Sequence, residues 1–144
     1  MTGIDTSFLV DLEVIESPRH AGALRYFEDW RRDSDNLFAV YDHVFLEFMH
    51  IVTDPKRFDS PLSFPEALVR SHFWMRQRRV RIVHQSAESF EQARIWTVAF
   101  KLGRKRIIDT HMAAAYRSAG VTALLTANPD DFRAFDAFEL PAYF

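Results

Sequence analysis

The chain has 144 residues, 48% hydrophobic and 26% charged, a composition that is ordinary for a globular protein and excludes a disordered or fibrous one. It contains no cysteine, which excludes a disulfide scaffold, a thiolate metal site and a cysteine nucleophile. Eighteen Lys and Arg against 20 Asp and Glu give a net charge of −2, which argues against a simple electrostatic nucleic-acid binder. No apolar run reaches the roughly 18 residues of a membrane span and no signal peptide is recognisable, so we predict a cytoplasmic protein.

In the first half of the chain, short apolar runs alternate with helical patterns. A strand is predicted to end near Asp5, and a helix to start at Thr6 or Ser7, which are common N-cap residues. Ser17 followed by Pro18 predicts the cap and first position of a second helix. The next predicted elements are a buried strand at 37–40 and a helix at about 42–52.

The second half continues the alternation. Ser63 and Glu66 have the spacing of a capping box and predict a helix over 64–75. A further helix is predicted to begin at Ser86 or Ser89 and to stop at Gly103, as a C′ glycine. The remaining predicted elements are a strand at 80–84, a helix at 109–119 ended by Gly120, a strand at 121–126, and a short helical piece after the turn at 128–132.

Strands separated by helices indicate βαβ units. We therefore predict a single α/β domain over residues 1–144, with a central parallel sheet in a three-layer α/β/α arrangement. Ligands bind beyond the carboxyl ends of the strands in such sheets. Asp5, Glu47 and Asp131 each follow a predicted strand, and Asp109 could reach the same edge if its helix starts there.

Each of these acids can also be interpreted structurally. Asp5, Asp109 and Asp131 could cap helices or turns. Glu47 is harder to explain in this way, because it lies in the apolar segment 44–49 and Glu is rarely buried without a partner. Clustered carboxylates need a counter-charge, and oxygen ligands without cysteine indicate Mg²⁺ or Mn²⁺. The chemistry that follows is metal-assisted phosphodiester hydrolysis.

Four short motifs, in this order, resemble those of PIN domains, in particular the VapC ribonuclease toxins of bacterial VapBC toxin–antitoxin pairs. The motifs are Ile4-Asp5-Thr6-Ser7, Val44-Phe45-Leu46-Glu47, Ile108-Asp109 followed by Met112-Ala113-Ala114 and Gly120, and the segment from Leu124 to Phe132. The resemblance covers nearly the whole chain and implies a PIN-like three-layer fold.

The resemblance also implies an acidic pocket that binds Mg²⁺ or Mn²⁺. Its acids would be Asp5, Glu47, Asp109 and Asp131, with Asp5 and Asp109 as the most direct metal ligands. Asp130 is the alternative to Asp131, and we favour Asp131 because it precedes Phe132. The supporting polar residues, which would hydrogen-bond the carboxylates or the phosphate, would be Ser7, Thr126 and Asn128.

The activity implied by the resemblance is metal-dependent cleavage of structured RNA (tRNA or rRNA) by the toxin of a type II pair. It further implies homodimerisation and inhibition by a VapB-type antitoxin. The alternatives are a housekeeping PIN ribonuclease in RNA processing and a non-catalytic PIN-like module that binds RNA or protein. Acids at all four motif positions argue against the non-catalytic module.

Other residues carry further predictions. Arg104, Lys105 and Arg106 lie shortly before Asp109 and are predicted to contact RNA phosphates. His111 could contact substrate or transfer a proton, but a surface or packing role is favoured. The aromatic residues of the helices at 64–75 and 90–102 are predicted to build the core. For the first of these helices a dimer or antitoxin surface is the alternative, because Phe64, Phe73 and Trp74 are a large apolar area.

Overall fold

The computed structural model describes all 144 residues and contains one four-stranded sheet. Its strands are β1 (Thr2–Ile4), β2 (Phe38–Tyr41), β3 (Val80–Val83) and β4 (Ala123–Leu125). They lie in the order β3-β2-β1-β4, and each neighbouring pair is parallel. The predicted central parallel sheet is therefore confirmed. Since β1 and β4 are neighbours, the residues that follow Ile4 and Leu125 emerge side by side at one edge.

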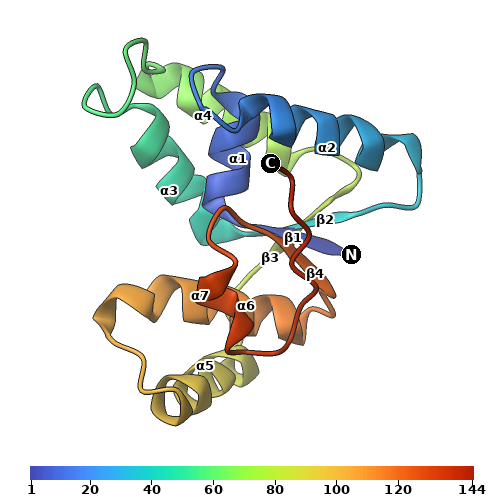
Figure 1. Cartoon of the computed structure of the whole chain (residues 1–144), viewed down its shortest axis with the longest axis vertical. Helices are drawn as coiled ribbons and strands as arrows, with labels where there is room; N and C mark the ends of the chain where they lie inside the picture. The colour runs from blue at the N-terminus through green and yellow to red at the C-terminus, as the bar shows by residue number, and fades with distance from the viewer.

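Helices cover both faces of this sheet (Figure 1). Figure 1 shows α1 to α4 on one face and α5 to α7 on the other, which is the predicted three-layer α/β/α arrangement. The helices are α1 (Thr6–Glu13), α2 (His20–Arg32), α3 (Asp42–Val52), α4 (Phe64–Met75), α5 (Ala87–Ala99), α6 (Ile107–Ser118) and α7 (Asp130–Arg133), with a 3₁₀ turn η1 (Arg104–Arg106) before α6. No helix is both long and apolar enough to span a bilayer.

Tyr116 of α6 fixes this helix against the carboxyl end of the sheet. Its side chain is fully buried, and its hydroxyl donates to the carbonyl oxygen of Ile4 at 2.7 Å. The same hydroxyl accepts the backbone N–H of Tyr41 at 2.8 Å, so one side chain joins α6 to β1 and β2. A Cβ atom at Gly3 would lie 2.9 Å from the Tyr116 ring, so glycine is needed there for this close packing. Because Tyr116 lies in the last turn of α6, it anchors the C-terminal part of this helix to the ends of β1 and β2.

Local sequence signals located several element ends correctly. Ser63 and Glu66 form the predicted capping box, and Ser86 caps α5. Gly120 ends α6 in the left-handed region with φ at 77°.

Several predicted element ends were wrong. Helix α6 begins at Ile107 rather than at Asp109, and β4 begins at Ala123 rather than at Val121.

The helix α2 begins at His20 rather than after Ser17. The Ser17 hydroxyl donates to Asp11 and accepts the backbone N–H of Arg19 in the turn that precedes the helix. The helix α5 ends at Ala99, and the left-handed residue after it is Lys101 rather than Gly103.

The prediction that the aromatic residues of α4 and α5 build the core was only partly right. Trp74 and Trp96 are buried in the core, and Trp96 stacks on Phe135 with ring centroids 4.4 Å apart. The phenylalanines of these two segments are exposed instead, namely Phe64, Phe73, Phe90 and Phe100. Both helices therefore present apolar side chains to the surface of the chain.

Candidate active site

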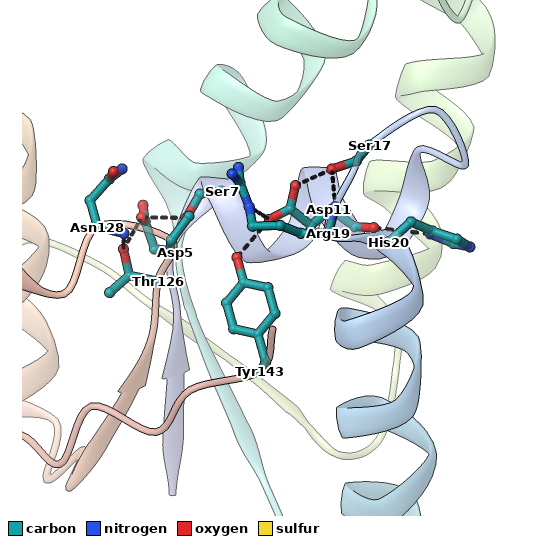
Figure 2. A network of polar contacts seen from close by, with 10 residues as sticks. Asp5, Ser7, Asp11, Ser17, Arg19, His20, Thr126, Asn128 and Tyr143 are labelled. Atoms are coloured by element: carbon teal, nitrogen blue, oxygen red, sulfur yellow. Dashed lines mark hydrogen bonds and ion pairs between the residues drawn. The ribbon is translucent and has the colours of Figure 1, made fainter.

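Asp5 lies where β1 ends and α1 begins, and its carboxylate is held from both sides. Its side chain is largely buried, with 9% of the residue exposed. The hydroxyls of Ser7 and Thr126 both donate to its Oδ2 atom, at 2.8 and 2.7 Å (Figure 2). Although Asp5 occupies the N-cap position of α1, its side chain makes no capping hydrogen bond. The carboxylate therefore does not act as a helix cap. Burial raises the pKa of Asp5 above the ordinary value, although the two hydroxyl donors act in the opposite direction.

The supporting residues are themselves fixed by the loop that follows β4. Ser7 Oγ accepts the backbone N–H of Ala127 at 2.9 Å, and Thr126 Oγ1 accepts that of Asn128 at 3.0 Å. Each hydroxyl therefore donates to Asp5 and accepts from the loop. The amide side chain of Asn128 makes no hydrogen bond of its own and lines the cleft described below.

Asp109 lies in the first turn of α6, close enough to Asp5 for their charges to interact. The helix starts at Ile107, so the condition under which Asp109 was expected to reach this edge of the sheet is met. Its pKa is raised to about 6, mainly by burial and next by the charge of Asp5. The nearby guanidinium of Arg106 acts in the opposite direction.

Arg106 sits between two of the acids rather than facing solvent. Its Nη1 atom lies 3.0 Å from Asp131 Oδ1, and its Nη2 atom donates to the Asp131 carbonyl oxygen. Its Nε atom lies 3.7 Å from Asp109 Oδ2 and is buried without a hydrogen bond. Arg106 is thus a counter-charge within the acidic site, whereas Arg104 and Lys105 are exposed and form no ion pair.

The two adjacent acids of α7 point in different directions. Asp131 faces Arg106 and lines the cleft. Asp130 pairs with Arg133 at 2.5 Å, and its side chain is 84% exposed. This geometry favours Asp131 over Asp130 as the fourth acid.

Glu47 approaches Asp5 from α3, on the opposite side from α6. Thr6 donates its hydroxyl to Glu47 Oε2 at 2.7 Å, which ties the glutamate to the residue next to Asp5. The charge of Glu47 raises the pKa of both Asp5 and Asp109. The structure thus brings all four predicted acids, here called the acidic cluster (Asp5, Glu47, Asp109 and Asp131), to one edge of the sheet. No three His, Asp or Glu side chains, however, come close enough together to form a ready metal-binding group.

A cleft of about 510 Å³ opens over three acids of the acidic cluster, and Glu47 does not line it. Asp5, Asp109 and Asp131 line one part of it, together with Ser7 and Asn128. The rest is formed by residues of α1, the loop before α2, the end of α3 with the loop after it, and α7, namely Val10, Asp11, Ser17, Pro18, Arg19, Ile51, Arg57, Phe58 and Phe132. The cleft therefore has an acidic part and, beside it, two arginines.

A second polar group in the wall of this cleft, here called the Asp11 cluster (Asp11, Ser17, Arg19 and Tyr143), was not predicted from the sequence. Asp11 is 2% exposed and is bonded by the other three residues (Figure 2). The sequence did indicate a buried acid here, because Asp11 lies between Val10 and Leu12 in an apolar helix. An acid in such a setting needs partners, as was argued for Glu47.

His111 does not line the cleft. Its Nδ1 atom lies 2.8 Å from Gln85 Oε1, and its ring packs against Phe90 with centroids 4.9 Å apart. Burial lowers its pKa, so the neutral form is favoured. These contacts match the packing role that the sequence favoured.

Comparison with known proteins gives relatives that match nearly the whole chain. No family model matches. Ribonuclease VapC24 of Mycobacterium tuberculosis is 26% identical over 137 residues, which cover 94% of this chain and 91% of that protein. The resemblance to VapC ribonucleases that the four motifs indicated is therefore confirmed.

Solved structures show the same fold. VapC20 of Mycobacterium tuberculosis, a toxin that cleaves the sarcin–ricin loop, superposes with a TM-score of 0.72 at 22% identity and covers 93% of this chain and 95% of its own. VapBC2 of Rickettsia felis, bound to promoter DNA, gives a TM-score of 0.69 at 15% identity, with 97% and 96% covered. The predicted PIN-like architecture is confirmed by these superpositions.

Proposed function

We infer that this chain is a PIN-domain protein of the VapC type, and we propose that it is an endoribonuclease acting as the toxin of a toxin–antitoxin pair. The similarity to VapC24 over 94% of the chain and the fold shared with VapC20 support this function. The observation that carries the catalytic part is the buried carboxylate of Asp5, held by Ser7 and Thr126 and electrostatically coupled to Asp109. The substrate class we propose is structured RNA, tRNA or rRNA.

We further propose that the acidic cluster binds Mg²⁺ or Mn²⁺. Its donors are carboxylate oxygens, which hard divalent cations prefer. Burial, and after it the charges of neighbouring acids, raise the pKa of Asp5 and Asp109, so a cation is favoured here even with Arg106 nearby. Asp5 and Asp109 would hold the ion directly, and Glu47 and Asp131 directly or through water. A bound ion of this kind lowers the pKa of a water molecule and stabilises the leaving oxygen.

The chain's own residues orient this chemistry. Both hydroxyls bond Oδ2 of Asp5, so its Oδ1 atom takes no side-chain hydroxyl, and Asp5 lines the cleft. The free amide of Asn128 lines the same cleft and can donate to a phosphate oxygen. The raised pKa of Asp109 places its proton exchange near neutral pH, where the loss of that proton accompanies binding of a cation.

The partner we propose is a VapB-type antitoxin. Toxin–antitoxin complexes from Klebsiella pneumoniae and Haemophilus influenzae share this fold, with TM-scores of 0.67 and 0.66. The exposed phenylalanines of α4 and α5 offer apolar surface for the antitoxin and for a second copy of this chain, so we also propose a homodimer. A housekeeping ribonuclease remains the alternative, and a small antitoxin gene immediately upstream would distinguish the two.

The test is induced expression in a bacterial host of the wild type beside Asp5→Asn and Asp35→Asn. Asp35 is exposed in the turn after α2, so its substitution is a matched control. Growth arrest and a discrete new RNA fragment are expected for the wild type and Asp35→Asn and absent for Asp5→Asn. Soluble, folded wild-type protein that causes neither arrest nor fragment would contradict the toxin function. Undiminished cleavage by Asp5→Asn would contradict the assigned site.

A further inference from the structure

The Asp11 cluster holds a nearly fully buried carboxylate in the wall of the candidate active-site cleft. Arg19 Nε donates to Asp11 Oδ2 at 2.7 Å, and the Tyr143 hydroxyl donates to the same atom at 2.6 Å. Ser17 donates its hydroxyl to Oδ1. These donors come from the loop before α2 and from the end of the chain, so three separate segments meet at one carboxylate.

Only part of the Arg19 guanidinium is used in this contact. Nε is bound to Asp11, whereas the side chain remains 38% exposed and lines the cleft together with Asp5 and Asp109. Figure 2 shows the guanidinium group turned toward the side on which Asp5 and Ser7 lie. The two Nη groups are therefore free to donate to a ligand in the cleft. An arginine stays charged at any physiological pH, so this positive charge is permanent.

The end of the chain helps to fix this side chain. Phe144 places its ring 5.6 Å from the Arg19 guanidinium carbon, and Tyr143 bonds the same carboxylate. The backbone of Tyr143 lies against α2 at Gly22, where a Cβ atom would come within 2.2 Å of the Tyr143 carbonyl oxygen. Arg19 is thus restrained by the carboxylate on one side and by an aromatic ring on another, which lowers the entropy lost when it binds a ligand.

We propose that Arg19 binds a phosphate of the RNA backbone beside the acidic cluster, and that Asp11, Ser17 and Tyr143 are its positioning residues. This inference rests on the proposed ribonuclease function. An RNA strand that approaches three carboxylates is repelled unless cations face its phosphates. A guanidinium with two free Nη groups matches two phosphate oxygens. Arg57 lines the same cleft, and its 3.6 Å contact with Asp54 leaves it 59% exposed as a second cation.

The test measures binding of fluorescently labelled bulk tRNA to the inactive Asp5→Asn chain over a range of salt concentrations. Adding Arg19→Gln should weaken binding at least about tenfold and reduce the slope of log K against log salt by about one. Arg32→Gln is the matched control, because Arg32 lies at the other end of α2 and also pairs with an aspartate. This control should leave affinity and slope unchanged.

Further variants separate phosphate binding from a structural role. Arg19→Gln leaves the buried Asp11 unpaired, so Asp11→Asn/Arg19→Gln is made as well, which removes both charges together. This double variant should lose as much RNA affinity and salt slope as Arg19→Gln does, but its thermal midpoint should return toward that of the wild type. Arg19→Lys should keep the slope and recover part of the affinity. Tyr143→Phe, in the otherwise active chain, should raise KM for RNA more than it lowers kcat, because the charge stays but is held less firmly.

The outcomes distinguish this inference from the proposed function. If the wild type cleaves RNA and the folded double variant binds with unchanged affinity and salt slope, the role of Arg19 is refuted and the ribonuclease function stands. An equal loss in Arg32→Gln would also refute it, because the effect would then be general electrostatics. If the wild type neither binds nor cleaves RNA, both proposals fail together.

Discussion

Replacing Asp109 by Asn should stabilise the fold while abolishing cleavage. The pKa of Asp109 is raised from 3.8 to about 6 by burial, by the charge of Asp5 and, less, by Asp131 and Glu47, with Arg106 opposing. An acid whose pKa is higher in the folded state destabilises that state when it ionises. The penalty is absent below pH 3.8, grows as the pH rises, and is complete above about pH 6.

The size of this effect follows from the shift. At 1.36 kcal/mol per pKa unit, the rise in pKa corresponds to about 3 kcal/mol above pH 6. The Asp109 side chain is 32% exposed, so screening by solvent reduces the expected gain for Asp109→Asn to about 1–2 kcal/mol at pH 8. At pH 5 roughly half of that gain should remain, because ionisation in the folded state is still incomplete.

Urea unfolding at pH 5 and pH 8, without divalent cations, measures this prediction. Asp130→Asn is the control, because its carboxylate is exposed at the same end of the molecule, and it should change the free energy of unfolding by less than about 0.5 kcal/mol. Two results would refute the electrostatic coupling of the acidic cluster. One is that Asp109→Asn is no more stable than the wild type at pH 8. The other is that its gain in free energy of unfolding does not increase from pH 5 to pH 8.

Two further predictions concern the same site. Thr126→Val removes a hydroxyl that donates to buried Asp5 and should lower the free energy of unfolding by about 1–3 kcal/mol, measured by urea unfolding. An equal effect of Thr122→Val, at an exposed position just before β4, would contradict it. Mg²⁺ should raise the thermal midpoint of the wild type with concentration, by mass action, and chelation should stop cleavage. Asp5→Asn should show a smaller rise or none, and a rise equal to that of the wild type would exclude the acidic cluster as the metal site.

The sequence by itself predicted most helices and strands, because their signals are local. The helix at Asp42–Val52 and the capping box of Ser63 and Glu66 depend on side-chain periodicity and on contacts three or four residues apart. The rule that ligands bind at the carboxyl ends of parallel strands was enough to predict that Asp5 and Asp131 lie at one edge, whereas Asp109 depended on where its helix starts. Some element ends were predicted wrongly, as at Ser17, whose hydroxyl bonds Asp11 and the backbone N–H of Arg19 in a turn before α2 begins.

Only the tertiary structure decided how the charges pair. Arg106 neutralises Asp131 instead of facing solvent, and Asp130 and Asp131 separate because one faces the cleft and the other faces Arg133. The place of Arg19 in the cleft could not be predicted from the sequence, because it depends on Asp11 and Tyr143. These two residues are 132 positions apart along the chain. The periodicity of apolar side chains indicates which face of a helix or strand is buried. The partner of a charged side chain is determined instead by distances through space. Those distances exist only once the sheet has brought the two ends of the chain together.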